Sequence, residues 1–274
     1  MHMAKALALL ILLSGCQQRA PLADRHGVVS IDYCADQMAI GLLPRRDIRA
    51  ISFEANSDVS FSAPRAKGIA RLRPTLEEII ALRPAVVIRS YGGDTKLAGQ
   101  LEKLGIRVVQ LGYAVTLTDV RTEMLRVGHE LDADPRARAL LAHFDAELQS
   151  VPTRSSAPRP RALYVTPGDV TTGPGSLVAS VIETAGFVPY RQRPGWGTLP
   201  LEDMARRPPD LMFRAFFDSS RYQQDRWTSS RHPVVARVAS KAMEVEVPGA
   251  WLACGNWLSG HAVARLAAAR KQMQ

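Results

Sequence analysis

The 274-residue sequence predicts an α/β fold of two lobes, each a parallel sheet flanked by helices, joined by one long backbone helix. Strand and helix patterns alternate over residues 28–116, and the alternation restarts at residue 161 after an almost wholly helical segment. In addition, LEEIIALRPAVVI at 76–88 recurs without a gap as LEDMARRPPDLMF at 201–213, an offset of 201 − 76 = 125 residues. One short helix-to-strand unit therefore occupies an equivalent place in both halves of the chain.

Residues 1–16 are typical of a lipoprotein signal peptide. A short basic start precedes AKALALLILL, an apolar run that is too short to span a bilayer. The run is followed by LSGC, which resembles a bacterial lipobox, so we expect Cys16 to be lipidated; ordinary cleavage beside an incidental cysteine is the alternative. Residues 17–27 then form a polar tether. We expect a periplasmic or otherwise extracytoplasmic protein that meets the membrane only through its lipid anchor.

The N-terminal lobe is expected to cover residues 28–116. Its strands are predicted at 28–31, 48–52, 86–90 and 106–111. A helix follows the loop after the opening strand, and another covers 96–104. Between them, Thr75 is expected to cap a helix that begins at Leu76, with Glu78 three residues later as in a capping box. This order of elements predicts a parallel sheet covered by helices.

Residues 117–152 are expected to form the helical linker that contains the backbone helix. TLTDVRTEMLRVGHELD makes one helix, and the next begins with Asp134 as N-cap and Pro135 in its first turn. The C-terminal lobe, residues 153–274, then repeats the alternation. Its strands are predicted at 161–166, 211–216 and 242–247, and its helices at 177–187, from 201, between the last two strands, and at 261–271.

Because the signal peptide predicts export, the three cysteines are expected in an oxidising compartment. With Cys16 lipidated, Cys34 and Cys254 remain. They either form a disulfide or lie near one site as two thiols, and a buried inert cysteine is the usual alternative. All of these arrangements are compatible with the sequence.

Composition and motifs argue against several classes of function. The net charge of +9 comes from scattered basic residues without a basic tail, so no nucleic-acid partner is expected. The sequence has no GxSxG, HExxH or P-loop motif and no identifiable histidine partner for Cys34 beside Asp36, so no enzymatic activity is expected. The histidines lack ligand spacing, so we expect no resident metal ion and no cofactor.

Five segments between about Val28 and Leu266 together resemble the helical-backbone (class III) periplasmic substrate-binding proteins of ABC importers, of the vitamin B12 and ferric-siderophore type. The segments are VVSIDYCADQ, the first copy of the repeated unit, LGIRVVQL, GPGSLVASVIETAGF and the second copy. The resemblance implies two rigid lobes with the ligand in the cleft between them. It also implies delivery to an ABC permease in the inner membrane, without chemistry on the ligand. We expect the protein to be a monomer.

The resemblance further implies that the ligand is a metal chelate, either cobalamin or another corrinoid, or a ferric siderophore. Heme or a free metal ion carried by the same class of transporter is an alternative. A surface lipoprotein that takes no part in transport is another. The paired Cys34 and Cys254 and the tryptophan-rich GAWLACGNW are not features of the B12-binding members, so the choice of chelate stays open.

The resemblance implies that the repeated unit takes part in docking to the permease. In the B12-binding members, one surface glutamate on each lobe meets arginines of the permease, and the matching residues here are Glu77 and Glu202. A two-fold permease dimer can accept one carboxylate from each pseudo-repeated lobe. The alternative is that each glutamate is only a favourable charge near the start of a helix.

Candidate ligand-binding residues follow from the positions of the predicted strands. Ligands gather at the carboxyl ends of parallel strands, and large planar ligands are gripped by aromatic walls with a few polar anchors. Arg214 can meet a ligand carboxylate or phosphate, or it can form a surface ion pair instead. For the aromatic residues, the alternative is core packing beneath a loop. The candidates are Tyr33, Cys34, Asp36, Tyr91, Trp196, Arg214, Phe216, Trp251, Cys254 and Trp257.

Overall fold

The computed structural model describes residues 25–56, 60, 64–92, 94–151, 158–217 and 232–273. The expected signal peptide, Cys16 and residues 17–24 of the tether lie outside these ranges. Within the described part of the chain, no helix combines the length and the hydrophobicity that crossing a membrane requires.

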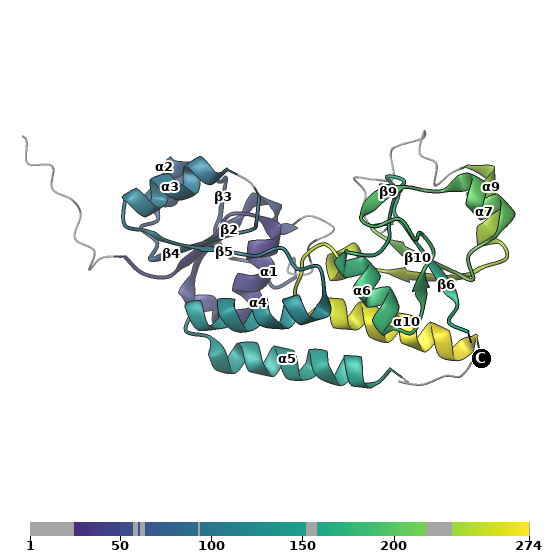
Figure 1. The fold of residues 1–274 in the computed structure, drawn as a ribbon. Helices are drawn as coiled ribbons and strands as arrows, with labels where there is room; N and C mark the ends of the chain where they lie inside the picture. The colour runs from purple at the N-terminus through teal and green to yellow at the C-terminus, as the bar shows by residue number, and fades with distance from the viewer. Residues whose placement is uncertain are drawn as a thin grey trace, which may run out of the picture.

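The first lobe is a five-stranded parallel sheet in the order β3-β2-β1-β4-β5 (Figure 1). Its strands are β1 Val28–Ser30, β2 Ile48–Ser52, β3 Arg71–Leu72, β4 Val86–Arg89 and β5 Arg107–Gln110, and its helices are α1 Tyr33–Leu42, α2 Leu76–Ala81 and α3 Thr95–Lys103. Val28 and Ile88 pack toward α1, whereas the adjacent Val29 and Val87 pack toward α2 and α3. Because both faces of the sheet are covered, its central strands are continuous apolar runs, as the sequence predicted.

The second lobe repeats this architecture with a four-stranded parallel sheet in the order β11-β10-β6-β8. Its strands are β6 Arg161–Val165, β8 Val188–Pro189, β10 Leu211–Ala215 and β11 Met243–Val247, and its main helices are α6 Leu177–Thr184, α7 Leu201–Arg206 and α9 Pro233–Ala239. A separate antiparallel pair, β7 Val170–Thr172 and β9 Trp196–Thr198, was not predicted. The predicted α/β fold of two parallel sheets flanked by helices is confirmed.

Two helices, α4 Leu117–Glu130 and α5 Asp134–Gln149, connect the lobes, and α5 runs along the molecule beside the last helix, α10 Ser259–Gln272 (Figure 1). The prediction that Asp134 is the N-cap of α5 is wrong by one residue. The carbonyl of Ala133 accepts the first helical hydrogen bond, from the Ala137 amide at 3.0 Å. The Asp134 carboxylate faces His129 and Arg138 instead.

The first helix begins earlier than the sequence pattern indicated. Tyr33, Cys34 and Asp36 were expected in a loop after the opening strand, but they form the first turn of α1. Asp32 is the reason, because its carboxylate accepts the Ala35 amide at 2.9 Å and caps the helix directly after the strand. Its second oxygen accepts the Ser90 amide at 2.7 Å, which ties α1 to the end of β4.

The two copies of the repeated unit fold in the same way, as α2 followed by β4 and as α7 followed by β10. Equivalent positions of the two copies have similar burial. Ile79 and Met204, for example, are both fully buried. Glu77 and Glu202 are both exposed. The caps differ, since Thr75 accepts the amide at the third helical position whereas α7 has no side-chain cap.

Asp36 joins three elements of the first lobe from a fully buried position. Its carboxylate accepts hydrogen bonds from the Ser52 amide at 2.9 Å, the Ser52 hydroxyl at 2.6 Å and the Ser30 hydroxyl, so α1 is fixed to β1 and β2. Burial raises the pKa of Asp36 to about 6, although the bonds from Ser30 and Ser52 act in the opposite direction.

Replacing Asp36 by Asn should therefore change how stability depends on pH. The folded pKa of Asp36 lies above its unfolded value of 3.8, so its stabilising effect is complete below that value and is lost as the pH rises through about 6. Between about pH 4 and pH 7, the native protein should lose up to about 3 kcal/mol of unfolding free energy relative to Asp36→Asn. Urea unfolding at both pH values measures the difference. A difference that does not change with pH, or the same trend in the variant Asp47→Asn, whose side chain is 47% exposed, would contradict this assignment to Asp36.

Candidate functional site

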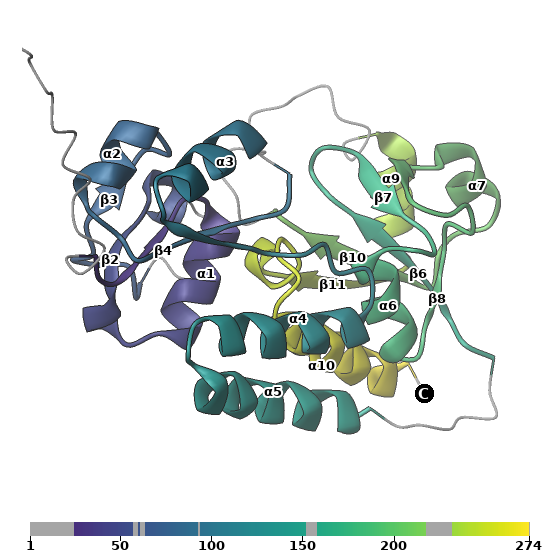
Figure 2. The same cartoon turned by 60° about the vertical axis from the view of Figure 1, so that its left-hand side comes forward.

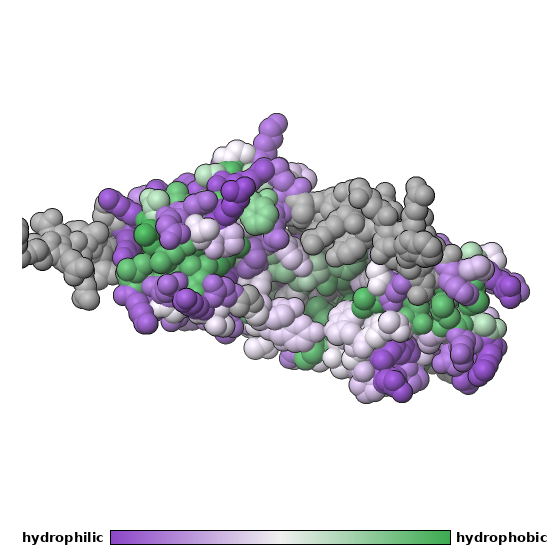
Figure 3. All heavy atoms as spheres, turned by 90° about the horizontal axis from the view of Figure 1, so that it is seen from above, coloured by the Kyte–Doolittle hydropathy of each residue, from purple (hydrophilic) through white to green (hydrophobic). Residues whose placement is uncertain are grey.

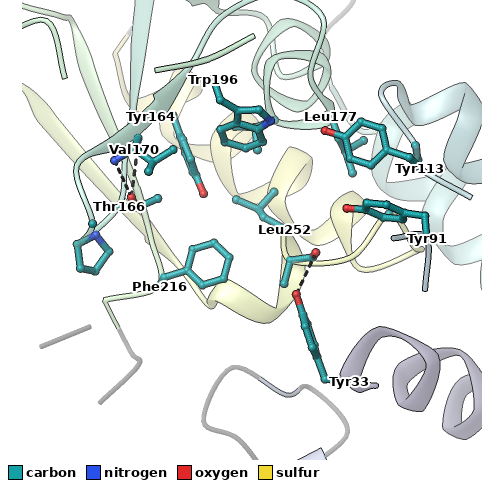
Figure 4. A pocket seen from close by; sticks show the side chains of 16 residues that line it. Tyr33, Tyr91, Tyr113, Tyr164, Thr166, Val170, Leu177, Trp196, Phe216 and Leu252 are labelled. Carbon is teal, nitrogen blue, oxygen red and sulfur yellow. Dashed lines mark hydrogen bonds between the residues drawn. The ribbon is translucent and has the colours of Figure 1, made fainter. Parts of the chain in front are cut away.

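A cavity of about 450 Å³ lies between the two lobes (Figure 4). Aromatic side chains dominate its lining, and the lining contains no Asp, Glu, Lys, Arg or His among the residues that the structure describes. The aromatic members are Tyr33, Tyr91, Tyr113, Tyr164, Trp196 and Phe216. Four of the six tyrosines of the chain are therefore at this one site.

Two tyrosines form the wall on the first lobe. Tyr91 follows β4 and Tyr113 follows β5, so the carboxyl ends of neighbouring parallel strands bring them together. Their rings meet edge to face with centroids 4.7 Å apart, and they are 45% and 51% exposed. Figure 4 shows both hydroxyl groups directed into the cavity. Burial and the neighbouring Tyr113 raise the pKa of Tyr91, so the Tyr91 phenol is neutral in the ligand-free site.

The opposite wall comes from the second lobe. Trp196 on β9 is 50% exposed and faces the cavity, with the buried Tyr164 of β6 behind it at a centroid distance of 6.3 Å. Phe216, directly after β10, has a φ of +69°, a left-handed conformation that costs a bulky residue about 1–3 kcal/mol. This backbone conformation directs the Phe216 ring toward the cavity.

The remaining wall is a segment that leaves the second lobe and returns to it. After β11, residues 249–258, here called the clamp segment, reach α1 of the first lobe before α10 begins (Figure 2). Leu252, Ala253 and Gly255 of the clamp segment line the cavity. The Tyr33 hydroxyl donates to the Ala253 carbonyl at 3.4 Å, so the first lobe and the clamp segment meet at the cavity itself.

The clamp segment is attached to successive turns of α1. Cys254 forms a disulfide with Cys34, 220 residues away in the sequence. Asn256 donates from its side-chain amide to the Gln37 side chain at 2.5 Å. The Trp257 ring packs on Gly41, where a β-carbon would lie only 2.2 Å from the ring. The contacts follow the helical spacing of one face of α1, so the crossing point is fixed along its length.

The structure brings four of the predicted ligand-binding residues to the cavity. They are Tyr33, Tyr91, Trp196 and Phe216. The other predicted residues do not line it. Asp36 lies in the serine network, Cys34 and Cys254 form the disulfide beneath the cavity, Arg214 pairs with Glu244 at 2.9 Å, Trp251 packs on His261, and Trp257 is buried.

Sequence reasoning missed two of the lining tyrosines. Tyr113 lies just beyond the predicted strand 106–111, so the strand-end rule that selected Tyr91 also applies to it. Tyr164 lies inside β6 and carried no such signal, because a strand interior gives no indication of an adjacent cavity. Over the described ranges, no group of three or more His, Cys, Asp or Glu side chains is arranged to hold a metal ion.

Comparisons with known proteins agree with this geometry. A family model described as "Periplasmic binding protein" matches residues 55–229. No curated protein matches the sequence. Among solved structures, the periplasmic heme-binding protein HutB of Vibrio cholerae is 15% identical, with a TM-score of 0.71 over 89% of this chain and 98% of that one.

Two other solved structures have the same fold. The apo form of the periplasmic heme-binding protein RhuT from Roseiflexus sp. RS-1 is 16% identical, with a TM-score of 0.69 over 89% of this chain and 97% of that one. The periplasmic vitamin B12-binding protein BtuF of Vibrio cholerae is also 16% identical, with a TM-score of 0.61 over 91% of this chain and 98% of that one. At these identities the likeness establishes a common fold.

Removing the disulfide should destabilise the protein strongly. Because the crosslink closes a loop of 220 residues, the double substitution Cys34→Ser with Cys254→Ser should lower the unfolding free energy by about 5 kcal/mol. Chemical denaturation with and without a reductant measures this. The reductant should lower the stability of the native protein toward that of the variant and leave the variant unchanged. An equal effect of the reductant on both proteins would contradict the expectation.

Proposed function

Because the chain belongs to the periplasmic binding protein family, whose members capture solutes without transforming them, we propose that it binds heme between its lobes and delivers it to an ABC permease. Heme was one alternative to the cobalamin or ferric siderophore first expected from the sequence. The main support for this proposal is the lining of the cavity, which is aromatic, rich in tyrosine and free of charged side chains among its described residues.

This lining discriminates between classes of metal chelate. The two faces of heme are planar and apolar, and aromatic walls such as Trp196 and Phe216 suit them. An anionic ferric siderophore requires cationic partners, and a bare metal ion requires converging His or carboxylate ligands. Neither set is present among the described lining residues.

The facing tyrosines supply a ligand for ferric iron. Phenolate oxygen is a known axial ligand of heme iron, and Tyr91 and Tyr113 present two hydroxyl groups on one wall. In this proposal one of them binds the iron and the other hydrogen-bonds to the phenolate. The macrocycle then lies between the two tyrosines and the opposite wall of Trp196 and Phe216.

Cobalamin is the second candidate, since the B12-binding protein BtuF has the same fold. The cavity volume of about 450 Å³ favours heme, because a corrinoid with its amide side chains and nucleotide loop is much larger than a porphyrin. The heme-binding proteins HutB and RhuT also resemble this chain with higher TM-scores than BtuF does.

Ferric heme should bind with the spectrum of a phenolate complex and with an affinity that rises with pH. The raised pKa of Tyr91 means that a proton leaves when iron binds, so the association constant should increase by up to about tenfold per pH unit below that pKa. Absorption titrations of the native protein at several pH values measure both properties.

The variants Tyr91→Phe and Tyr113→Phe assign the ligand. One of them should lose the phenolate spectrum and the pH dependence, and the other should keep the spectrum with weaker binding. Tyr190→Phe is the matched control, because Tyr190 lies outside the cavity. Unchanged spectra in both cavity variants, or saturable binding of cobalamin but not of heme, would reject the proposal.

Permease docking is proposed for Glu77 and Glu202. The helices that carry them, α2 and α7, lie on the same side of the molecule, opposite α5 and α10 (Figure 1). Figure 3 views this side and shows hydrophilic residues at both of its ends. The Glu202 side chain is 88% exposed, and its contact with Arg206 is a long 3.9 Å pair that water screens. Both carboxylates are thus available for arginines of a partner, and such pairs fix orientation.

Replacing Glu77 and Glu202 together by Ala should abolish uptake of the ligand by cells while leaving its affinity for the isolated protein unchanged. Uptake of labelled heme and absorption titration give the two measurements. Glu183→Ala on α6 is the matched control, since Glu183 is exposed but lies away from α2 and α7. Uptake equal to that of the control variant would refute the docking role.

We also propose that Cys16 carries the lipid and that residues 17–27 tether a monomer to the membrane. The LSGC sequence and the short apolar run before it support this proposal. In the same cells, the protein with Cys16→Ser should lose the lipid-dependent mass increase of the native chain. An identical mass shift in both proteins would exclude lipidation at this residue.

A further inference from the structure

A second cavity, of about 940 Å³, lies on the second lobe outside the interlobe cleft. Strand β9 and its flanking residues separate the two cavities, because Trp196 lines the cleft whereas the next residues, Gly197 and Thr198, line the second cavity. Its polar lining residues are Arg161, Tyr190, Arg191, Gln192, Arg193, Thr198, Asp203 and Arg207. We call this cavity the basic pocket.

The charge of the basic pocket contrasts with that of the cleft. Four guanidinium groups line it, against the single carboxylate of Asp203, and one of the four, Arg161, also pairs with Asp210 outside the lining at 3.7 Å. Arg193 and Arg207 are exposed, and neither side chain has a hydrogen-bond or ion-pair partner among the described residues. Like charges this close repel one another, so the pocket gains free energy when an anion enters.

One arginine of the pocket is held rigidly. The Arg191 guanidinium donates from Nη1 to the carbonyls of Arg193, Pro194 and Gly195, the last two at 3.2 and 2.9 Å. The guanidinium also packs on Gly197, where a β-carbon would lie 2.7 Å from Nη2. Its Nε and Nη2 groups have no partner within the described part of the chain, so a positioned edge of the guanidinium remains available to a ligand.

A second arginine braces the floor of the pocket. Arg161 donates to the Pro208 carbonyl at 2.8 Å and lies 5.4 Å from the centre of the Tyr190 ring. Tyr190 in turn donates its hydroxyl to the Arg207 carbonyl at 2.8 Å. The pocket therefore combines two fixed guanidinium groups with two that are free to close on a ligand. Such preorganisation lowers the entropic cost of binding.

We propose that the basic pocket is a binding site for a phosphate group. Guanidinium groups bind phosphate oxygens in pairs of parallel hydrogen bonds, and several arginines around one cavity match its charge and its multiple acceptors. This proposal does not require that heme binds in the cleft. The basic pocket nevertheless shares a wall with the cleft. Arg191 contacts the residues on both sides of Trp196, at Gly195 and Gly197, so a bound phosphate changes the support of the Trp196 ring.

The phosphate has two possible sources with the same chemistry, a free phosphate compound or the headgroup of a membrane phospholipid. Inorganic phosphate tests the first source by calorimetry on the mature chain without its lipid. Vesicles of phosphatidylglycerol, compared with vesicles of phosphatidylcholine, test the second source by sedimentation. Tryptophan fluorescence provides a further readout, which Trp196→Phe should remove without removing the binding itself.

The decisive variant is Arg193→Gln with Arg207→Gln. Its matched control is Arg46→Gln with Arg138→Gln, which makes the same change in net charge at two positions outside the pocket, with side chains 84% and 64% exposed. We expect one saturable site per chain for inorganic phosphate, with affinity about tenfold weaker in the pocket variant and nearly unchanged in the control.

The proposal is supported if the pocket variant loses binding of inorganic phosphate or of phosphatidylglycerol vesicles and the control variant retains it. The probe that binds then identifies the source of the phosphate group. Equal losses in both variants would show that only net charge matters, and the proposal would fail. The absence of saturable binding to both probes would also overturn it, whatever the heme titrations show.

Discussion

The contact between the clamp segment and α1 determines the shape of the interlobe cleft. Among the residues that the structure describes, the other main connection between the lobes runs through α4, α5 and the helices packed on them, on the side of the molecule away from α2 and α7. The clamp segment adds a second connection directly beneath the cavity, through the Cys34–Cys254 disulfide, the Asn256–Gln37 hydrogen bond and the packing of Trp257 on Gly41. Two separated connections resist the hinge motion that one connection allows. The walls of the cleft are therefore preorganised, and a ligand binds without a large entropic cost for ordering them.

Strand β9 places two opposite chemical environments back to back. Trp196 lines the uncharged cleft, whereas the next two residues, Gly197 and Thr198, border the arginines of the basic pocket. Under the proposed function, the uncharged lining suits the apolar faces of a porphyrin, because charged side chains packed against those faces would lose hydration. The arginines lie on the other side of β9, so the cleft stays uncharged among its described lining residues while the same lobe offers a cationic surface elsewhere.

Much of the fold was predictable because buried parallel strands and amphipathic helices leave strong patterns. The repeated unit is the clearest case, since Ile79 and Met204 occupy equivalent buried positions in both lobes. The site was less predictable. Strand ends correctly indicated where Tyr91 lies, but Trp251 and Trp257 follow β11 and still point away from the cavity, because the clamp segment turns them onto α10 and α1. The sequence contains no local signal for such a crossing, which depends on contacts 219 and 220 residues apart.

The long separation between Cys34 and Cys254 has a consequence for biogenesis. During export the chain emerges from its N-terminus, so Cys34 reaches the oxidising compartment long before its partner does. Until the clamp segment has been exported, the face of α1 that it covers is therefore exposed and Cys34 is a free thiol. The binding cleft acquires its third wall only when the whole protein has crossed the membrane. Truncated chains cannot close it, and the disulfide thus marks the chains whose translocation is complete.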